Sequence, residues 1–210
     1  MNDEPNIIDL FPTPLYVVTD VLTEEENQEL IDHIIATQDK QVGKGADCWD
    51  SGKASPKNSF GIDLKNEEEF NLILKKAHFH VTQYAKKFNF PSNNFDYMNK
   101  EWWWNVYDNH SYQEFHSHTP HLFSGVYYAK VPIGSSDIKF RHPMWNLGIP
   151  HTNENQYNSD HAVFKCYDRT MIIFPSTLIH CVPSGENTEP RISFSFCLLY
   201  TSPSPRDVSR

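Results

Sequence analysis

Residues 112–131 read YQEFHSHTPHLFSGVYYAKV, and this stretch decides the fold class of the chain. Its two halves, residues 112–118 and 124–131, are rich in the aromatic and β-branched residues that are typical of strands. Short runs of the same kind continue on both sides, separated by turns of Pro, Gly, Asn and Ser. These further candidates are residues 102–107, 138–140, 161–167, 170–174, 179–182 and 192–199. So many short strands predict an antiparallel sandwich or jelly roll.

Upstream of this region the sequence predicts an edge strand and a helix. Residues 7–18 are apolar and contain two prolines, which strands tolerate at the edge of a sheet. Residues 23–37 then place apolar side chains at helical spacing. Thr23 fits the N-cap of this helix and Glu26 fits the reciprocal position of a capping box.

A second helix is predicted over residues 70–88, where apolar residues recur every three or four positions. Asn66 can cap it and Pro91 can end it. We expect this helix to pack on one face of the sheet. The predicted fold class is therefore mainly β with flanking α-helices, a double-stranded β-helix (jelly roll) core covered on one face by helices.

The chain is long enough for one domain. We expect that domain to span residues 1–200, with the core at about 102–200 and helical support from 1–101. Residues 38–63 are polar and glycine-rich and predict a long loop, and residues 141–160 predict a lid or substrate loop. Residues 201–210 are nearly devoid of apolar side chains, which predicts a disordered or artefactual tail.

Composition excludes several classes of protein. Acidic residues outnumber basic ones by 27 to 18, and the net charge of −9 argues against a nucleic-acid or anionic-membrane partner. No apolar run approaches the ~18 residues of a membrane span, and the N-terminus has no basic-then-apolar signal segment. The four cysteines are scattered with no CxxC pair, as expected of reduced thiols. A cytoplasmic protein is the expectation, and the edge strand is compatible with a homodimer.

Three histidines are candidates for a metal site. Residues two apart on a strand point to the same face, so His116 and His118 can reach one point together. His180, which follows an apolar strand and a proline-led turn, can supply a third imidazole. A facial set of three ligands leaves the other side of an octahedral metal open for substrates and oxygen. The HxH pattern alone is weak, because the chain has 11 histidines.

Arg191 and Ser193 are candidates for holding a carboxylate. They share one face of a predicted strand, and the apolar residues that alternate with them lie on the other face. A buried guanidinium is costly unless an anion pairs with it. A carboxylate held by two hydrogen bonds from Arg191, with a third from Ser193, meets that need. The alternative is a salt bridge from Arg191 to a carboxylate of this protein.

Together these residues resemble the iron(II)- and 2-oxoglutarate-dependent oxygenases. The usual pattern of that family is HxD/E, a distal His, and an Arg followed two residues later by Ser. The nearest subgroup begins with an LFPTP-like strand. The matching segments of this chain are LFPTP (10–14), HSHTP (116–120), SGVYY (124–128), IFPS (173–176) leading to His180, and RIS (191–193).

The resemblance implies cofactors and roles. The cofactors would be Fe(II), 2-oxoglutarate as cosubstrate and O2, and the reaction would be hydroxylation with release of succinate and CO2. His116 and His180 would be iron ligands, and Arg191 and Ser193 would anchor the distal carboxylate of 2-oxoglutarate. Asn105 and Tyr107 resemble cosubstrate-contacting residues of some relatives; as an alternative they are core residues of a strand.

One departure from the family pattern concerns the third ligand. His118 stands where the family has an acidic residue, so iron(II) would keep its full double charge and lean more on the anionic cosubstrate. Glu114 is a rival ligand, because period-two spacing puts it on the same face as His116. We favour His118 as the third ligand.

Two other functions remain open from the sequence. A cupin-type dioxygenase or isomerase also uses HxH, but Leu122 and Phe123 stand where a Glu would be expected, and Arg191 would lack a purpose. A non-catalytic jelly-roll module that binds a sugar or peptide is the third possibility. The substrate, a small molecule or a peptidyl group, is not indicated by any motif; Tyr127, Tyr128 and Trp145 are candidates for shaping its pocket.

Overall fold

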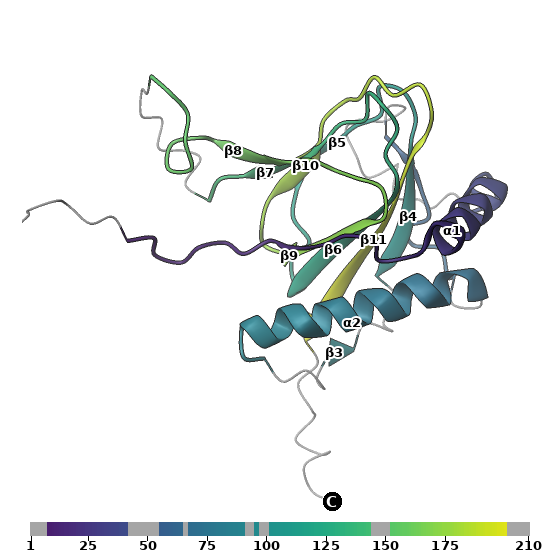
Figure 1. The fold of residues 1–210 in the computed structure, drawn as a ribbon, viewed down its shortest axis with the longest axis horizontal. Coiled ribbons are helices and arrows are strands. Elements are labelled where there is room, and N and C mark those ends of the chain that lie inside the picture. Colours follow the sequence, from purple (N-terminus) through teal and green to yellow (C-terminus); the bar gives the residue numbers. More distant parts are fainter. Residues whose placement is uncertain are drawn as a thin grey trace, which may run out of the picture.

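The computed structural model describes residues 8–41, 55–64, 67–90, 95–96, 101–143 and 152–200. Within these ranges the chain forms two antiparallel sheets and two α-helices (Figure 1). The helices cover the outer face of the larger sheet, and the smaller sheet faces its inner side. The predicted fold class, a jelly-roll core with helices on one face, is confirmed.

The larger sheet has the strand order β1-β9-β6-β11-β4-β2, and β3 pairs with β11. Its strands are β1 (Tyr16–Val18), β2 (Lys57–Asn58), β3 (Phe95–Asp96), β4 (Trp102–Tyr107), β6 (Phe123–Lys130), β9 (Thr170–Pro175) and β11 (Arg191–Tyr200). The smaller sheet has the order β5-β10-β7-β8. Its strands are β5 (Gln113–His116), β7 (Ile138–Arg141), β8 (His161–Phe164) and β10 (His180–Val182).

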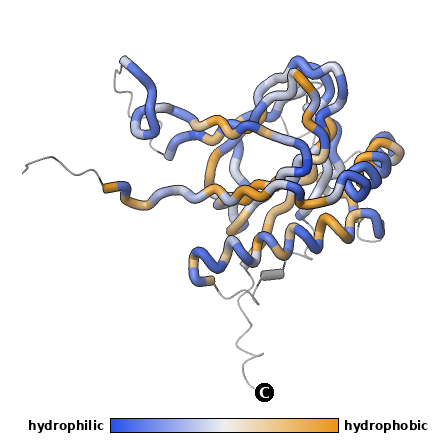
Figure 2. The backbone as a smooth tube through the Cα atoms, in the orientation of Figure 1, coloured by the Kyte–Doolittle hydropathy of each residue, from blue (hydrophilic) through white to orange (hydrophobic). Residues whose placement is uncertain are grey.

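Two apolar clusters follow from the alternation of side chains along the central strands. On β11, Ile192, Phe194 and Phe196 face the helices α1 (Glu24–Thr37) and α2 (Asn71–Lys87) and join their buried side chains in one core. Figure 2 shows hydrophobic positions recurring along α2 and along the strands that it covers. A smaller cluster, which includes Ile172 and Phe174 of β9, lies between the two sheets. The polar residues of β11 therefore project between the sheets.

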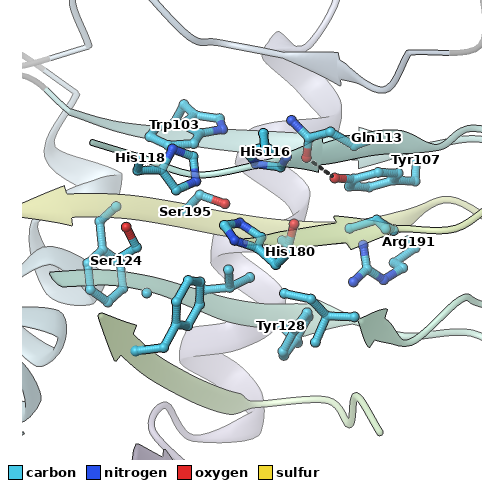
Figure 3. Close-up of a pocket in the computed structure, with 17 residues that line it drawn as sticks. Trp103, Tyr107, Gln113, His116, His118, Ser124, Tyr128, His180, Arg191 and Ser195 are labelled. Carbon is cyan, nitrogen blue, oxygen red and sulfur yellow. Dashed lines mark hydrogen bonds between the residues drawn. The ribbon is translucent and has the colours of Figure 1, made fainter. Parts of the chain in front are cut away.

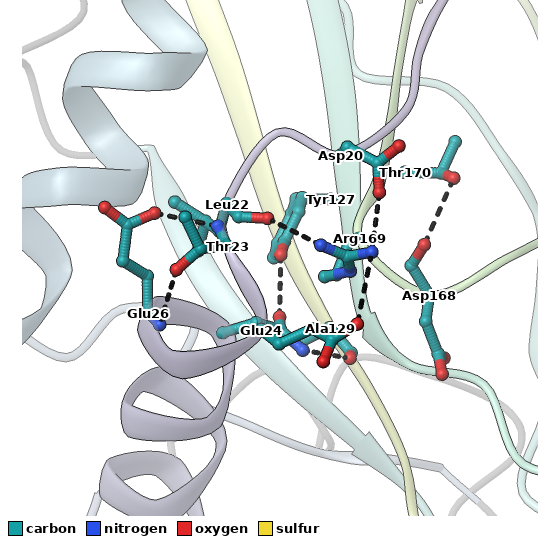
Figure 4. Close-up of polar contacts among 11 residues, drawn as sticks. Asp20, Leu22, Thr23, Glu24, Glu26, Tyr127, Ala129, Asp168, Arg169 and Thr170 are labelled. Carbon is teal, nitrogen blue, oxygen red and sulfur yellow. Dashed lines mark hydrogen bonds and ion pairs between the residues drawn. The ribbon is translucent and has the colours of Figure 1, made fainter.

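The N-terminal end of α1 is locked by the capping box that the sequence predicts (Figure 4). The hydroxyl of Thr23 accepts a hydrogen bond from Glu26 N, and the Glu26 carboxylate accepts one from Thr23 N at 2.8 Å. Arg169, just before β9, donates to Leu22 O and pairs with Asp20 at 2.7 Å. These contacts fix the helix against the edge of the larger sheet.

The second helix begins later than the sequence suggests. A 3-10 turn (η3, Glu68–Phe70) precedes α2, and Phe70, which has no side-chain cap hydrogen bond, holds the N-cap position. The predicted cap Asn66 and the predicted terminator Pro91 lie outside the described residues. Of the edge strand predicted over residues 7–18, the described part forms a strand only at Tyr16–Val18. Its edge position agrees with the prediction, because among the described strands β1 pairs with β9 alone.

Several other predictions fall partly or wholly on undescribed residues. These are the loop at 38–63, part of which forms β2, the loop at 141–160, Trp145 and the tail at 201–210. Of the cysteines, Cys166, Cys181 and Cys197 are buried free thiols, and Cys48 is not described. Among the described helices, none has the length and apolar character needed to cross a membrane.

Candidate metal centre and anion pocket

The inner faces of the two sheets enclose a hollow of about 420 Å³, its open mouth included (Figure 3). His116, His118 and His180 line one part of it, and Arg191 and Ser193 line another. The structure thus brings the predicted histidines and the predicted anion-binding residues into one site.

The three imidazoles converge on one point. His116 on β5 lies directly opposite His180 on β10 in the register of the smaller sheet. His118 follows the end of β5, and its ring lies 4.9 Å from that of His116 and 5.1 Å from that of His180 between centroids. One ring nitrogen from each residue falls within 4.8 Å of the others. This spacing allows all three to bind one metal ion.

Backbone carbonyls orient two of the three rings for metal binding. Nδ1 of His116 lies 2.7 Å from Glu114 O, and Nδ1 of His180 lies 2.9 Å from Leu178 O. A carbonyl oxygen only accepts, so each Nδ1 carries the proton and donates it. The lone pair is then on Nε2, the tautomer that metal-binding histidines adopt when their other nitrogen is held by a carbonyl.

The three imidazoles are held in the neutral form. Burial lowers the pKa of His180 well below its ordinary value, and the neighbouring rings of His116 and His118 lower it further. Burial likewise lowers the pKa of His118 to about 3 and also lowers the pKa of His116. At neutral pH the site therefore presents lone pairs without having to release protons.

Arg191 lies deep in the same hollow without a charged partner. It is only 2% exposed, and its Nε and Nη1 atoms have no hydrogen-bond partner among the described residues. Its guanidinium lies over the rings of Tyr107 (4.8 Å) and Tyr128 (5.2 Å), and Nη2 is 3.8 Å from Cys166 Sγ. No described carboxylate pairs with it, so the alternative of an internal salt bridge finds no support in the described part of the chain.

Two tyrosines around Arg191 remain hydrogen-bond donors. Burial raises the pKa of Tyr107 and raises that of Tyr128 well above its ordinary value, so both phenols keep their protons. Tyr107 donates to Gln113 Oε1 at 3.1 Å, whereas the Tyr128 hydroxyl is buried with no hydrogen-bond partner among the described residues. Three buried donor atoms without partners among the described residues could be satisfied by one bound anion.

Asn105 supports the polar side of β11 from the neighbouring strand. It lies opposite Ser193, as Tyr107 lies opposite Arg191, in the register of β4 and β11. Its amide donates to Ser195 Oγ at 3.1 Å and to Ser193 Oγ at 3.5 Å. Asn105 is not among the residues that line the hollow, so the contact with cosubstrate predicted for it stays a prediction.

The expectation that Glu114 shares the face of His116 is wrong. The pairing of β5 with β10 shifts register between His180 and Val182, so that two residues of β5, Glu114 and Phe115, lie opposite one residue of β10, Cys181. This irregularity breaks the period-two spacing. Gln113, not Glu114, lines the hollow with His116, and Glu114 lines a separate depression.

Some lining residues were missed or misplaced by sequence reasoning. Tyr127 faces the helices and donates to Asn27 Oδ1 at 2.6 Å, so among the pair of tyrosines only Tyr128 reaches the site. The alternation along β6 carries that signal, since Tyr128 shares a face with Ser124. Neither Trp103, whose ring centroid lies 5.7 Å from that of His118, nor Gln113 belongs to a motif that would single it out.

Comparisons with known proteins agree with this geometry. Residues 101–197 match the model of a family described as "Putative 2OG-Fe(II) oxygenase". Among curated proteins, none matches the chain. A Pseudomonas putida prolyl-4-hydroxylase superposes with a TM-score of 0.63 at 9% identity, covering 90% of this chain and 94% of that one.

Two further solved structures have the same fold. A Trichoplax adhaerens prolyl hydroxylase, solved with a peptide of hypoxia inducible factor, gives a TM-score of 0.62 at 11% identity, covering 89% and 83% of the two chains. The α-ketoglutarate-dependent epimerase SnoN of nogalamycin biosynthesis gives 0.63 at 12% identity, covering 90% and 82%. At these identities the likeness establishes the fold. The LFPTP segment stays a predicted resemblance.

Proposed function

We propose that the protein is an Fe(II)- and 2-oxoglutarate-dependent dioxygenase that hydroxylates its substrate and releases succinate and CO2. The match of residues 101–197 to the model of a 2OG-Fe(II) oxygenase family supports this proposal. The family uses Fe(II), 2-oxoglutarate and O2, and the histidine triad fits iron binding. The observation that carries the proposal is one hollow containing three converging imidazoles and a buried arginine that forms no ion pair with the described residues.

The donor set fits iron(II). His116, His118 and His180 would hold the metal through nitrogen atoms, and imidazole suits iron among other transition metals. When bound, iron and 2-oxoglutarate together supply the oxidative decarboxylation that activates dioxygen. The three histidine ligands are neutral, so they would not reduce the double positive charge of the metal. The anionic cosubstrate would then offset that charge.

The other end of the hollow fits the distal carboxylate of 2-oxoglutarate. Arg191 offers two unpaired nitrogen atoms, and Tyr128 offers an unpaired hydroxyl. Ser193 lines the same space. Charge-assisted hydrogen bonds from a rigid guanidinium fix both the position and the orientation of a carboxylate. These residues would hold the cosubstrate, and the apolar wall with Phe174 would exclude water from the metal.

The substrate that we propose is a small molecule or a peptidyl side chain that enters at the open mouth of the hollow. A net charge of −9 disfavours nucleic acid. Succinate release, measured with iron-reconstituted protein across panels of amino acids, peptides, sugars and small metabolites, identifies the class. Prolyl peptides belong in the first panel because two proteins of the same fold are prolyl hydroxylases.

Anaerobic addition of Fe(II) and then 2-oxoglutarate tests the proposal directly. We expect a weak visible metal-to-ligand band that requires both additions and is absent from His180→Ala. Succinate would then form on admission of oxygen. A cupin-type enzyme would bind the metal but give no band with 2-oxoglutarate, and a non-catalytic module would keep its ligand binding in His180→Ala; either result contradicts the proposal.

A further inference from the structure

The third histidine of the triad is held differently from the other two. His116 and His180 lie in paired strands, and each ring donates to a backbone carbonyl. His118 lies beyond the end of β5, and no side-chain hydrogen bond holds its ring among the described residues. The position of its imidazole therefore depends on how its backbone is fixed.

A second histidine fixes that backbone. His118 N donates to Ser176 O at 2.9 Å. His118 O accepts two hydrogen bonds from His121, one from its backbone N at 2.9 Å and one from its ring Nδ1 at 2.8 Å. The backbone N–H of His121 alone would satisfy the hydrogen-bonding need of this carbonyl. The second hydrogen bond, from the His121 ring, therefore serves to fix the orientation of the His118 backbone.

Glu101 lies against the ring of His121 on the other side as a charge contact, because His121 Nε2 has no aligned hydrogen-bond partner among the described residues. Its Oε2 lies 3.1 Å from His121 Nε2, and the two side chains are 36% and 10% exposed. Glu101 is itself anchored, because its carbonyl accepts from Cys197 N of β11 at 2.7 Å. A continuous set of contacts thus runs from the larger sheet through Glu101 and His121 to the main chain of His118.

We propose that Glu101 and His121 are positioning residues for His118 as a metal ligand. The inference rests on the proposed function, since it takes the triad as the metal site. Partners behind a metal ligand typically change metal affinity by about 10- to 100-fold when they are removed. The ring of His118 packs against aromatic rings but makes no hydrogen bond with the described residues, so the partners act here through the backbone of the ligand.

The test compares Co(II) binding by His121→Leu, His121→Asn and Glu101→Gln with binding by the wild type. Asparagine can still donate to His118 O, so we expect a loss of about tenfold or more in His121→Leu and smaller losses in the other two. The d–d absorption of bound Co(II) reports ligand number, and in His121→Leu it should shift toward the spectrum of His118→Ala. If His121→Asn keeps more Co(II) affinity than His121→Leu, the effect comes from the hydrogen bond to His118 O and not from the size of the side chain.

The chain supplies a matched control. His33 and Glu67 form a similar pair, with Nε2 and Oε2 2.8 Å apart and side chains 14% and 31% exposed, on the helical side of the molecule. His33, Glu67 and Glu69 could also hold a metal ion, so the control is read at the triad: His33→Leu should lower the thermal midpoint and keep the Co(II) affinity and spectrum that His118→Ala loses. Unchanged affinity and an unchanged spectrum in His121→Leu would overturn the inference; if that variant does not fold, the same result in His121→Asn and Glu101→Gln decides it.

The experiment also separates the inference from the proposed function. If His118→Ala binds Co(II) as tightly as the wild type, the assignment of the triad as the metal site is wrong. If His118→Ala loses affinity and the His121 and Glu101 variants do not, the triad stands and the positioning role fails.

Discussion

At the scale of single residues, Arg191 is placed where stability alone would not put it. Its guanidinium is almost fully buried, two of its nitrogen atoms are unpaired, and the nearest described groups are aromatic faces and a thiol. An unpaired buried charge costs several kcal/mol, whereas a hydrophobic residue of the same volume does not. The energetic cost is recovered only when an anion binds.

Arg191→Met should therefore change stability and binding in opposite directions. Without ligands, we expect the variant to be more stable, by about 1–4 kcal/mol. Affinity for 2-oxoglutarate should fall at least ~30-fold, from the loss of a buried charge pair worth about 2 kcal/mol or more. Thermal unfolding and calorimetric titration in the presence of Co(II) measure the two effects.

Arg169→Met is the matched control for this substitution. Arg169 pairs with Asp20 at the junction of α1 and the sheet, away from the hollow, so its loss should lower stability slightly and leave 2-oxoglutarate affinity unchanged. An Arg191→Met protein that is both less stable and normal in cosubstrate binding would contradict the role given to Arg191.

Because the three histidines are buried or half-buried, we expect the protein without metal to lose stability in acid. Burial lowers the pKa of His118 to about 3 and lowers that of His180, so the folded state stays neutral where the unfolded chain takes up protons near pH 6.5. Stability from this source is complete above about pH 6.5 and is lost as the pH falls toward the folded values. Denaturant unfolding at pH 7.5 and pH 5 should show the loss, and His180→Gln should reduce it.

An exposed histidine provides the comparison. His110 lies at the surface in a turn with φ of 64°, which asparagine tolerates, so His110→Asn should keep the pH dependence of the wild type. Equal pH slopes in the wild type and His180→Gln would show that the buried ring is not the source.

At the scale of elements, sequence patterns predicted those features of the structure that depend on interactions between residues close in the sequence. The capping box of α1 and the bounds of β4 agree with the sequence, since both depend on neighbouring residues. The register shift between β5 and β10 was not predictable, because it depends on a pairing between segments distant in the sequence. It is this shift that removes Glu114 from the site and brings in Gln113. The convergence of His180 with His116 likewise needed the fold, or the family resemblance that implied it.

The docking of α1 onto β6 depends on one buried amide. Asn27 accepts from the Tyr127 hydroxyl at 2.6 Å and donates to Ala129 O at 3.0 Å. Asn27→Ala leaves both partners unsatisfied and should cost about 2–6 kcal/mol, at about 1–3 kcal/mol for each buried group. Tyr127→Phe should cost about 1 kcal/mol, and the double variant less than the sum. Additive losses in urea unfolding would show that the two side chains do not act as one contact.

At the scale of the whole molecule, the site joins two sheets that otherwise meet through a small apolar cluster. His116 and His180 belong to the smaller sheet, whereas Arg191 and Tyr128 belong to the larger one. A metal bound to the first pair and a dicarboxylate that reaches from the metal to the second pair would connect both layers. Ligand binding should then stabilise the fold as a unit, by an amount set by concentration and affinity.

Thermal unfolding with Co(II) and 2-oxoglutarate, added separately and together, tests this coupling. At about 100 times its dissociation constant, 2-oxoglutarate should add ~2.7 kcal/mol, or roughly 5–10 °C for a domain of this size, when the metal is present. Without metal its effect should be much smaller, because only one of its two anchoring ends is held. Arg191→Met should retain the shift from Co(II) and lose the further shift from 2-oxoglutarate. A 2-oxoglutarate shift that is independent of the metal, or that persists in Arg191→Met, would place the cosubstrate elsewhere and remove the bridge between the sheets.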